Sequence, residues 1–293
     1  MLLAEACVNT TAGPLAAFQM SDADVYELSV AAWMHDCGKI ATPEYIMDKA
    51  TKLHGLFDNI ELVAARFEIV RRDIQYDHQL SEEERALKLT QLDADLLFLQ
   101  STNIGGEYMS MALQGRVRQI AADYHFTMNG ISHSVLNAQE VINLCVERGT
   151  LNAEERSIVN RHIDITIEML ESLPFPKHLQ NVPEFAGGHH EKMDGTGYPR
   201  KLKREQMSVQ ARIMAIADIF EALTANDRPY KKAKTLSESL GIMAKMARDQ
   251  HVDADLFRVF VEQGVYLQFA QQFLAAEQID EVDFNKLLEV AGS

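Results

Sequence analysis

Paired histidines, two acids and a Gly-Tyr-Pro turn are gathered in eleven residues of this chain, between His189 and Pro199. Glycine and proline break helices, and charged segments bury little apolar surface, so this stretch suits a site better than a core. A second polar group, His35-Asp36-Cys37-Gly38-Lys39, lies far upstream. Imidazole and carboxylate ligands without thiolate suit iron, manganese or zinc. The two stretches together therefore predict a metal cluster.

Isolated residues elsewhere could complete such a cluster. His162 lies among apolar residues at helical spacing, and taken alone it fits a core histidine better than a ligand. Asp218 interrupts an apolar run from Ile213 to Phe220, where an unpaired buried charge would be too costly. Beside the histidines, a metal ligand is a better interpretation of Asp218 than a helix cap or a salt bridge. Two ions bridged by a carboxylate would lower the pKa of a shared water and clamp a phosphodiester for in-line attack.

The charge balance limits the kinds of partner. The 293 residues carry a net charge of -15, which argues against binding DNA, RNA or an anionic membrane, because those partners need an excess of Lys and Arg. Between Glu191 and Lys234, however, ten basic residues stand against six acids. This basic segment lies beside the predicted site, where a small anionic substrate would need it. A solvated charged surface is an equally good interpretation.

Cysteine usage and hydropathy indicate a location. Cys7, Cys37 and Cys145 are an odd, widely spaced set without a CxxC pair, which predicts neither a disulfide framework nor a thiolate zinc site. Cys37 is interpreted as a small packing residue rather than a nucleophile. The sequence has no apolar run of about 18 residues and no basic signal-peptide start. The predicted location is the cytoplasm, with the cytoplasmic part of a longer membrane-anchored sensor as the alternative.

Helices must bring these residues together, because apolar residues recur at helical spacing almost throughout and prolines are confined to joints. The predicted fold class is all-α. Ser21 is expected to begin a helix that ends at His35-Asp36, with Gly38 as its stop, so that these two ligands lie at the end of a buried helix. Further helices are expected over 150–170, which carries His162, and over 209–225, which carries Asp218.

Residues 51–148 read as an insertion between the first of these helices and the helix of His162. They contain an amphipathic run over 54–75 and a helix that begins with the capping-box pattern Ser81-x-x-Glu84. We expect a helical hairpin or coiled-coil-like region there, serving homodimerisation or signal input. Packing as an ordinary bundle within one domain is the alternative. The predicted domains are thus a catalytic domain, 1–50 with 149–293, and the inserted region, 51–148.

The combined pattern resembles the HD-GYP family, a branch of the HD-domain metal-dependent phosphohydrolases. It comprises His35-Asp36-x-Gly38-Lys39, a helical His162, the string HHExxDGxGYP at 189–199, Asp218, and Arg228-Pro229-Tyr230-Lys231. An HD dipeptide alone means little, whereas the eleven-residue string is highly specific. The resemblance covers residues 21–50 and about 149–260. It implies an HD-domain helical bundle that hydrolyses bacterial cyclic dinucleotides, chiefly cyclic di-GMP to pGpG or GMP.

The resemblance also implies roles for particular residues. The metal ligands would be His35, Asp36, His162, His189, His190 and Asp218, with Asp36 able to bridge two iron or manganese ions. Asp36 and Lys39 would be catalytic, with Lys39 beside the bridging hydroxide or the scissile phosphate. Substrate phosphates would be held by Arg228, Lys231 and Lys39. The loop residues Gly197, Tyr198 and Pro199 would contact a partner, notably a diguanylate cyclase.

Two departures from the family pattern bear on the site. Family members carry an upstream Glu or His that completes a third metal position; this chain starts too late to show it, and Glu5 is a weak substitute. Two ions are therefore expected rather than three. The other departure is the long insertion, which leaves room for a non-catalytic module that binds a cyclic dinucleotide or a partner. Hydrolysis of another nucleotide, such as cyclic GMP-AMP, is a further alternative.

Overall fold

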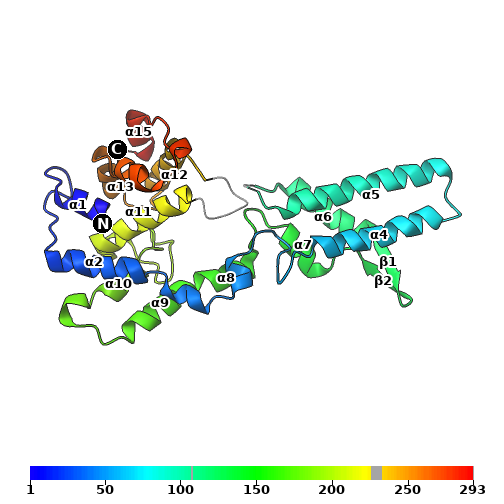
Figure 1. The fold of residues 1–293 in the computed structure, drawn as a ribbon, viewed down its shortest axis with the longest axis horizontal. Coiled ribbons are helices and arrows are strands. Elements are labelled where there is room, and N and C mark those ends of the chain that lie inside the picture. Colours follow the sequence, from blue (N-terminus) through cyan, green and yellow to red (C-terminus); the bar gives the residue numbers. More distant parts are fainter. Residues whose placement is uncertain (107, 226–232, 293) are drawn as a thin grey trace. The chain divides into compact units, whose positions relative to one another are not determined.

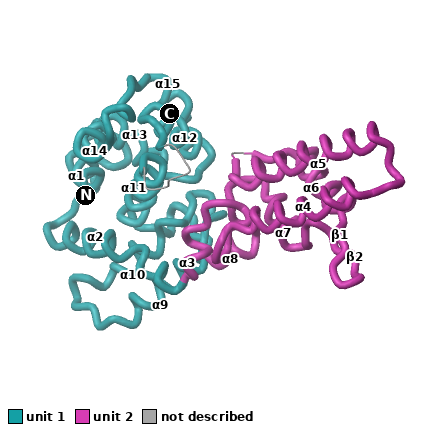
Figure 2. The backbone as a smooth tube through the Cα atoms, turned by 45° about the vertical axis from the view of Figure 1, so that its right-hand side comes forward, with its two compact units in different colours: residues 1–41, 160–293 teal, residues 42–159 magenta. Residues whose placement is uncertain are grey.

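The computed structural model describes residues 1–106, 108–225 and 233–292, which form two compact units (Figure 1, Figure 2). Unit 1 comprises residues 1–41 and 160–293, and unit 2 comprises residues 42–159. Each unit has its own apolar core. The predicted all-α class is confirmed, since the described residues contain only one sheet, a two-stranded hairpin. Unit 2 extends beyond the predicted insertion, 51–148, at both ends.

Unit 1 is built from short helices around one core. In chain order they are α1 (Leu2–Val8), α2 (Asp22–Met34), η1 (Cys37–Ala41), α9 (His162–Glu171), η2 (Lys177–Leu179), α10 (Val182–Gly187), η3 (Arg204–Gln206), α11 (Val209–Thr224), α12 (Leu236–Arg248), α13 (Ala254–Glu262), α14 (Val265–Phe273), η4 (Ala276–Gln278) and α15 (Phe284–Ala291). The core side chains Leu28 on α2, Ile216 on α11 and Phe257 on α13 are fully buried. Burying side chains of this size contributes roughly 1.5 to 3 kcal/mol each.

Local sequence signals account for where the site-bearing helices begin. The predicted start of α2 is confirmed: the Ser21 hydroxyl accepts from the backbone N–H of Asp24, and the Asp24 carboxylate accepts from the backbone N–H of Ser21. The single helix expected over 150–170 is wrong. The chain forms α8 (Ala153–Asn160) and α9, with a break at Arg161 that makes His162 the first residue of α9.

Unit 2 contains three longer helices, one hairpin and shorter helices. Its elements are α3 (Glu44–Met47), α4 (Ile60–Tyr76), α5 (Glu82–Asn103), α6 (Met111–Asp123), β1 (His125–Met128), β2 (Ile131–Ser134), α7 (Ala138–Leu144) and most of α8. The capping box predicted at Ser81 and Glu84 is confirmed at the start of α5. The hairpin was not predicted, although Asn129-Gly130, the two turn residues, have positive φ and are a typical hairpin signal. Among the helices of the described residues, none combines the length and apolar character that a membrane crossing needs.

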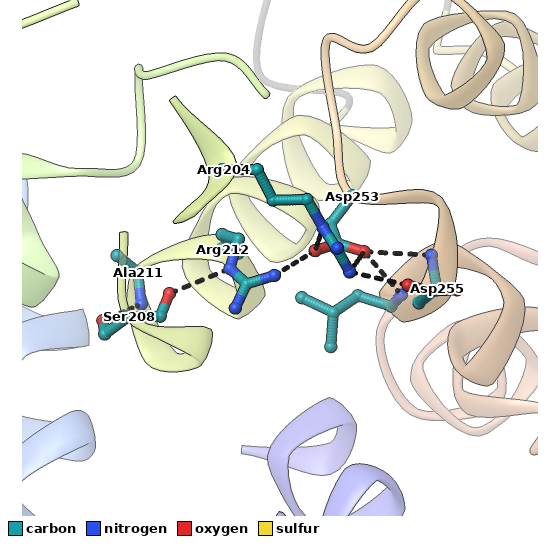
Figure 3. Close-up of polar contacts among 7 residues, drawn as sticks. Arg204, Ser208, Ala211, Arg212, Asp253 and Asp255 are labelled. Carbon is teal, nitrogen blue, oxygen red and sulfur yellow. Dashed lines mark hydrogen bonds and ion pairs between the residues drawn. The ribbon is translucent and has the colours of Figure 1, made fainter. Parts of the chain in front are cut away.

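A buried carboxylate, Asp253, ties α11 to the start of α13 (Figure 3). Its side chain is 1% exposed, and its Oδ2 accepts from Nε of Arg204 at 2.9 Å and from Nη1 of Arg212 on α11. Its Oδ1 accepts from the backbone N–H groups of Asp255 and Leu256, at 2.9 and 3.2 Å, and so caps α13. Both arginines belong to the basic segment noted in the sequence. These two cations therefore serve the fold rather than a substrate.

Candidate metal centre

Four separate stretches of unit 1 meet at one place. His35 and Asp36 follow α2, His162 begins α9, His189 and His190 follow α10, and Asp218 lies within α11. Ligand atoms of Asp36, His162, His189 and His190 all lie within 4.8 Å of one another, and the same holds for His35, Asp36 and Asp218. All six residues predicted as ligands are thus brought together.

Asp36 belongs to both groups of ligand residues, and each of its two carboxylate oxygens faces a different group. Oδ1 lies 3.2 Å from Nε2 of His162 and 3.9 Å from Nε2 of His189. Oδ2 lies 3.3 Å from Nε2 of His35, which is 3.6 Å from Oδ1 of Asp218. Ligands with bonds of about 2.1 Å to one shared ion lie roughly 3 to 4 Å apart. The spacing therefore suits two ions with Asp36 between them.

Two buried atoms in this cluster need a partner. Within the described residues, neither Oδ1 of Asp36 nor Nε2 of His189 has a hydrogen-bond partner of acceptable geometry, although both atoms are buried. Buried polar atoms without a partner are rare in folded proteins, because the lost hydration is not replaced. A cation between the carboxylate oxygen and the imidazole nitrogen would satisfy both. The donor set therefore fits a divalent metal ion.

Backbone carbonyls orient two of the imidazole rings. Nδ1 of His35 donates to the carbonyl of Ala32 at 2.7 Å, and Nδ1 of His189 donates to the carbonyl of Ala186 at 2.6 Å. A donor at Nδ1 leaves Nε2 as the ligating nitrogen, which is how most metal-binding histidines are held. In both cases Nε2 is the atom that faces Asp36.

Burial and neighbouring charges set the protonation states of the cluster, and only His35 among these groups holds a proton that a bound metal ion would displace. Burial lowers the pKa of His189, and burial together with His189 lowers the pKa of His190 to about 3, so both rings are neutral. Burial opposes ionisation of Asp36 and Asp218, but their contacts with histidines outweigh it and hold both pKa values low. Burial also opposes a charge on His35, yet hydrogen bonds to Asp218 and Asp36 raise its pKa to about 10. The two carboxylates thus attract positive charge to this point.

The remaining predicted site residues have mixed outcomes. Nζ of Lys39 donates to Oδ2 of Asp36, so Lys39 lies at the edge of the cluster. Arg228 and Lys231 lie outside the described residues. Glu5 is exposed on α1 and belongs to neither group of clustered ligands in the described part of the chain. Cys37 packs against the apolar core, which confirms its interpretation as a packing residue.

Gly38 allows η1 to lie directly against α9. Its backbone N–H donates to the Thr166 hydroxyl at 2.9 Å. A Cβ atom at this position would lie 2.1 Å from the carbonyl oxygen of His162 and 2.6 Å from the backbone nitrogen of Thr166. The interpretation of Gly38 as the helix stop is wrong, because α2 ends at Met34 and Gly38 lies within η1, where the close approach to α9 excludes a side chain.

We expect Gly38→Ala to lower the free energy of unfolding by about 1 to 3 kcal/mol, because backbone atoms must move to accept the methyl group. The same movement would separate Asp36 from His162 and weaken metal binding. Gly115→Ala is the matched control, since a Cβ there meets nothing within 4 Å on α6. Chemical denaturation and metal titration of both variants would check this, and equal stability of the two would contradict it.

Glu191 holds the Gly-Tyr-Pro loop against the cluster. Its side chain is almost fully buried and accepts from the backbone N–H groups of Arg200, at 2.7 Å, and Leu202, at 2.9 Å. Gly197 passes so close to Glu191 that an added Cβ would lie 2.5 Å from the Cα of Glu191. The loop places the ring of Tyr198 in a stack on His190, with centroids 4.9 Å apart. Glu191 therefore positions the loop that backs a predicted ligand.

Replacing Glu191 by Gln should cost about 1 to 3 kcal/mol, because its amide group faces a backbone N–H that loses its acceptor. We expect any metal-dependent activity of the cluster to fall about tenfold while the metal content stays unchanged, since the loop and not the ligand set is disturbed. Glu205→Gln, at an exposed position of η3, is the control. Loss of the metal together with the activity would show that Glu191 acts on the ligands themselves.

The sequence analysis did not identify the buried acidic residues that join one helix to another. Glu27 on α2 is buried and accepts from the backbone N–H of Asn181 at 2.6 Å and from its Nδ2 at 3.1 Å, which joins α2 to the start of α10. The available signal was a carboxylate among the apolar residues of a predicted core helix, the same signal that was noted for Asp218. The only sequence signal for Asp253 is that an aspartate directly before a helix is a typical N-cap residue, here that of α13.

Comparison with known proteins agrees with this site. Residues 136–256 match the HD domain family, a range that contains His162, the HHExxDGxGYP string and Asp218 but begins after His35-Asp36. The chain is 34% identical over 134 residues to 3'3'-cGAMP-specific phosphodiesterase 1 of Vibrio cholerae, covering 46% of this chain and 30% of that protein. It is 39% identical over 119 residues to a cyclic di-GMP phosphodiesterase of Pseudomonas aeruginosa, covering 40% and 28%.

A third relative is a cyclic di-GMP phosphodiesterase response regulator of Xanthomonas campestris, 38% identical over 95 residues, which cover 32% of this chain and 25% of that protein. The chain thus spans less than a third of the length of each of these three relatives. The HD-domain match covers four of the six clustered ligands and the whole Gly-Tyr-Pro motif. Motif, domain match and relatives therefore agree with the resemblance of this chain to the HD-GYP family of HD-domain proteins.

Proposed function

We propose that this protein is a metal-dependent phosphodiesterase that hydrolyses a cyclic dinucleotide, chiefly cyclic di-GMP to pGpG or GMP, in bacterial second-messenger signalling. The observation that carries this proposal is the shared carboxylate of Asp36, whose two oxygens face two groups of ligands. The names of the relatives, which act on cyclic di-GMP or 3'3'-cGAMP, support the class of substrate.

Two divalent ions bound at these ligands would supply Lewis-acid polarisation of the phosphodiester and a more acidic water. His162, His189 and His190 would hold one ion, His35 and Asp218 the other, and Asp36 both. Their N and O donors without thiolate suit iron, manganese or zinc, and the resemblance to the HD-GYP family favours iron or manganese. A third ion stays an alternative that needs a further ligand.

The surface of the cluster suggests how a substrate reaches it. The side chains of His35, Asp36 and Asp218 are about a quarter exposed, whereas those of His162 and His189 are buried. The phosphodiester would therefore approach from the side of His35 and Asp218. Lys39 lies on the exposed edge, where its ammonium can neutralise a phosphate oxygen.

The proposal extends to partners and location. A diguanylate cyclase would contact the loop of Gly197, Tyr198 and Pro199, and a second copy of the chain would contact the inserted helices. DNA and RNA are not expected as partners, given the net charge of -15. We place the protein in the cytoplasm, alone or as the cytoplasmic part of a longer membrane-anchored sensor.

Hydrolysis of 3'3'-cGAMP is a second candidate, because a relative with that printed specificity is 34% identical to this chain, and one named for cyclic di-GMP is 39% identical. Protein loaded anaerobically with Fe(II) or Mn(II) would be incubated with each cyclic dinucleotide, and the products separated by liquid chromatography. We expect linear dinucleotide or mononucleotide from cyclic di-GMP, and the ratio of the two rates decides the preferred substrate. Protein that holds two ions per chain and opens neither compound would contradict the proposed function.

A further inference from the structure

The outward face of α5 carries small and apolar residues at heptad spacing. The opposite face packs into the core of unit 2 through Leu92 and Leu99. The outward stripe consists of six exposed residues at alternating steps of three and four: Leu87, Thr90, Ala94, Leu97, Ser101 and Ile104. Its three large members are 72%, 67% and 60% exposed. Apolar residues at this spacing are the pattern by which one helix packs against another.

The stripe is complementary to itself when two copies run antiparallel. A two-fold axis midway between Ala94 and Leu97 places those two residues opposite each other, and it also places Thr90 opposite Ser101 and Leu87 opposite Ile104. Each first heptad position then meets a fourth position of the other copy, as knobs-into-holes packing requires. At the centre of the seam the small Ala94 faces the larger Leu97, and at each end Leu87 faces Ile104. Self-complementarity of this kind defines a two-fold symmetric interface.

The polar residues of the stripe are compatible with a dry seam. The Thr90 hydroxyl donates to the carbonyl of Ala86 at 2.9 Å, and the Ser101 hydroxyl donates to the carbonyl of Phe98 at 2.8 Å. Both hydroxyls therefore have a partner within their own helix, and burying them leaves no unmet donor. Neither residue needs a polar group from the facing chain.

Charges at the two ends of α5 are also complementary. The first turn is acidic, with Glu82, Glu83 and Glu84. Arg148 lies at the other end of the helix, since its neighbour Gly149 donates to the carbonyl of Gly106 at 3.2 Å. Antiparallel pairing brings the acidic turn of one copy toward the arginine of the other. A parallel pairing would instead place the two acidic turns side by side.

Helix α4 packs beside α5 (Figure 1) and also carries exposed apolar residues. These include Leu62, Ile69 and Tyr76. The stripe on α5 is about 26 Å long at 1.5 Å per residue. A stable interface usually buries about 800 Å² on each partner, which one seam of this length needs a flanking helix to reach. Two α4–α5 pairs facing each other would supply that width.

We propose that two copies of the chain associate through α5, antiparallel about a two-fold axis between Ala94 and Leu97, with α4 flanking the seam. Sedimentation of the full chain at low and high protein concentration should show a monomer–dimer equilibrium. Leu97→Glu places a charge at the centre of the seam and should weaken the dimer at least tenfold. The control is Lys88→Glu, an exposed position of α5 outside the stripe, which should change little. A monomeric wild type, or equal effects of the two variants, would overturn the proposal.

Cross-linking tests the direction of pairing. Positions 90 and 101 are about 16 Å apart along the helix. In the antiparallel pair, the two copies of position 90 are therefore also about 16 Å apart, as are the two copies of position 101, which is beyond the reach of a shorter bis-maleimide. Thr90→Cys and Ser101→Cys proteins should each cross-link no more than wild type, which carries the same native cysteines. A mixture of the two proteins should give a covalent dimer, because antiparallel pairing brings the two positions together. Strong cross-linking of either variant alone would show a parallel dimer, and no cross-link in the mixture would show that another partner covers the stripe.

Discussion

Asp36→Ala is expected to lower the rate of cyclic di-GMP hydrolysis by about a thousandfold or more, because it removes the one carboxylate that both proposed ions share. The metal content should fall well below two ions per chain, while the helical circular dichroism spectrum stays unchanged. Asp36→Asn is the stricter variant, since it keeps the shape of the side chain and loses only its charge. Parallel measurements of turnover and metal content on each variant would check this.

A matched control is Asp22→Ala, which removes an exposed carboxylate from the first turn of α2, the same helix that leads into Asp36. It should retain full activity and both ions. Full activity of Asp36→Ala in metal-loaded protein would rule out the shared-carboxylate mechanism, whatever the substrate.

Asp253→Ala is expected to lower the free energy of unfolding by about 3 to 5 kcal/mol, because it leaves two arginine side chains without their buried partner and removes the cap of α13. Asp249→Ala is the matched control four residues earlier, since its pair with Arg248 is exposed and should contribute little. Urea denaturation followed by circular dichroism would measure both. Equal loss of stability in the two variants would contradict a special role for the buried carboxylate.

The stabilisation by Asp253 should depend on pH in a definite direction. Burial opposes its ionisation, but the hydrogen bond from Arg204 and the charges of both arginines outweigh this and lower the pKa of Asp253. An unfolded aspartate has a pKa of about 3.9, so the contribution is complete above that pH and is lost as the pH falls toward the lower folded pKa. The difference in stability between the wild type and Asp253→Asn should therefore shrink below about pH 4.

The fold class and part of the clustered polar residues could be predicted from local signals, whereas His162 was included only because of the resemblance to the HD-GYP family. The polar residues of the eleven-residue motif do not suit a core, and Asp218 is a charged residue in an apolar helix. Departures of this kind from the local pattern are typical of functional sites. Helical periodicity indicated the all-α class, and capping boxes marked the starts of α2 and α5. These features depend on residues only a few positions apart.

Features that depend on contacts between distant segments could not be predicted. The close approach of Gly38 to His162 and Thr166 spans more than a hundred residues, and no sequence pattern records it. The pairing of Arg204 and Arg212 with Asp253 likewise joins segments with no sequence signal in common. The basic segment was open to two interpretations because charge alone does not say whether a cation faces a substrate or a buried acid.

Anomalous diffraction from crystals of manganese-loaded protein tests the central claim most directly. We predict two manganese peaks on either side of Asp36, one within bonding distance of His162, His189 and His190 and the other within bonding distance of His35 and Asp218. One peak alone, or peaks bound by other residues, would contradict a two-ion centre built on a shared aspartate.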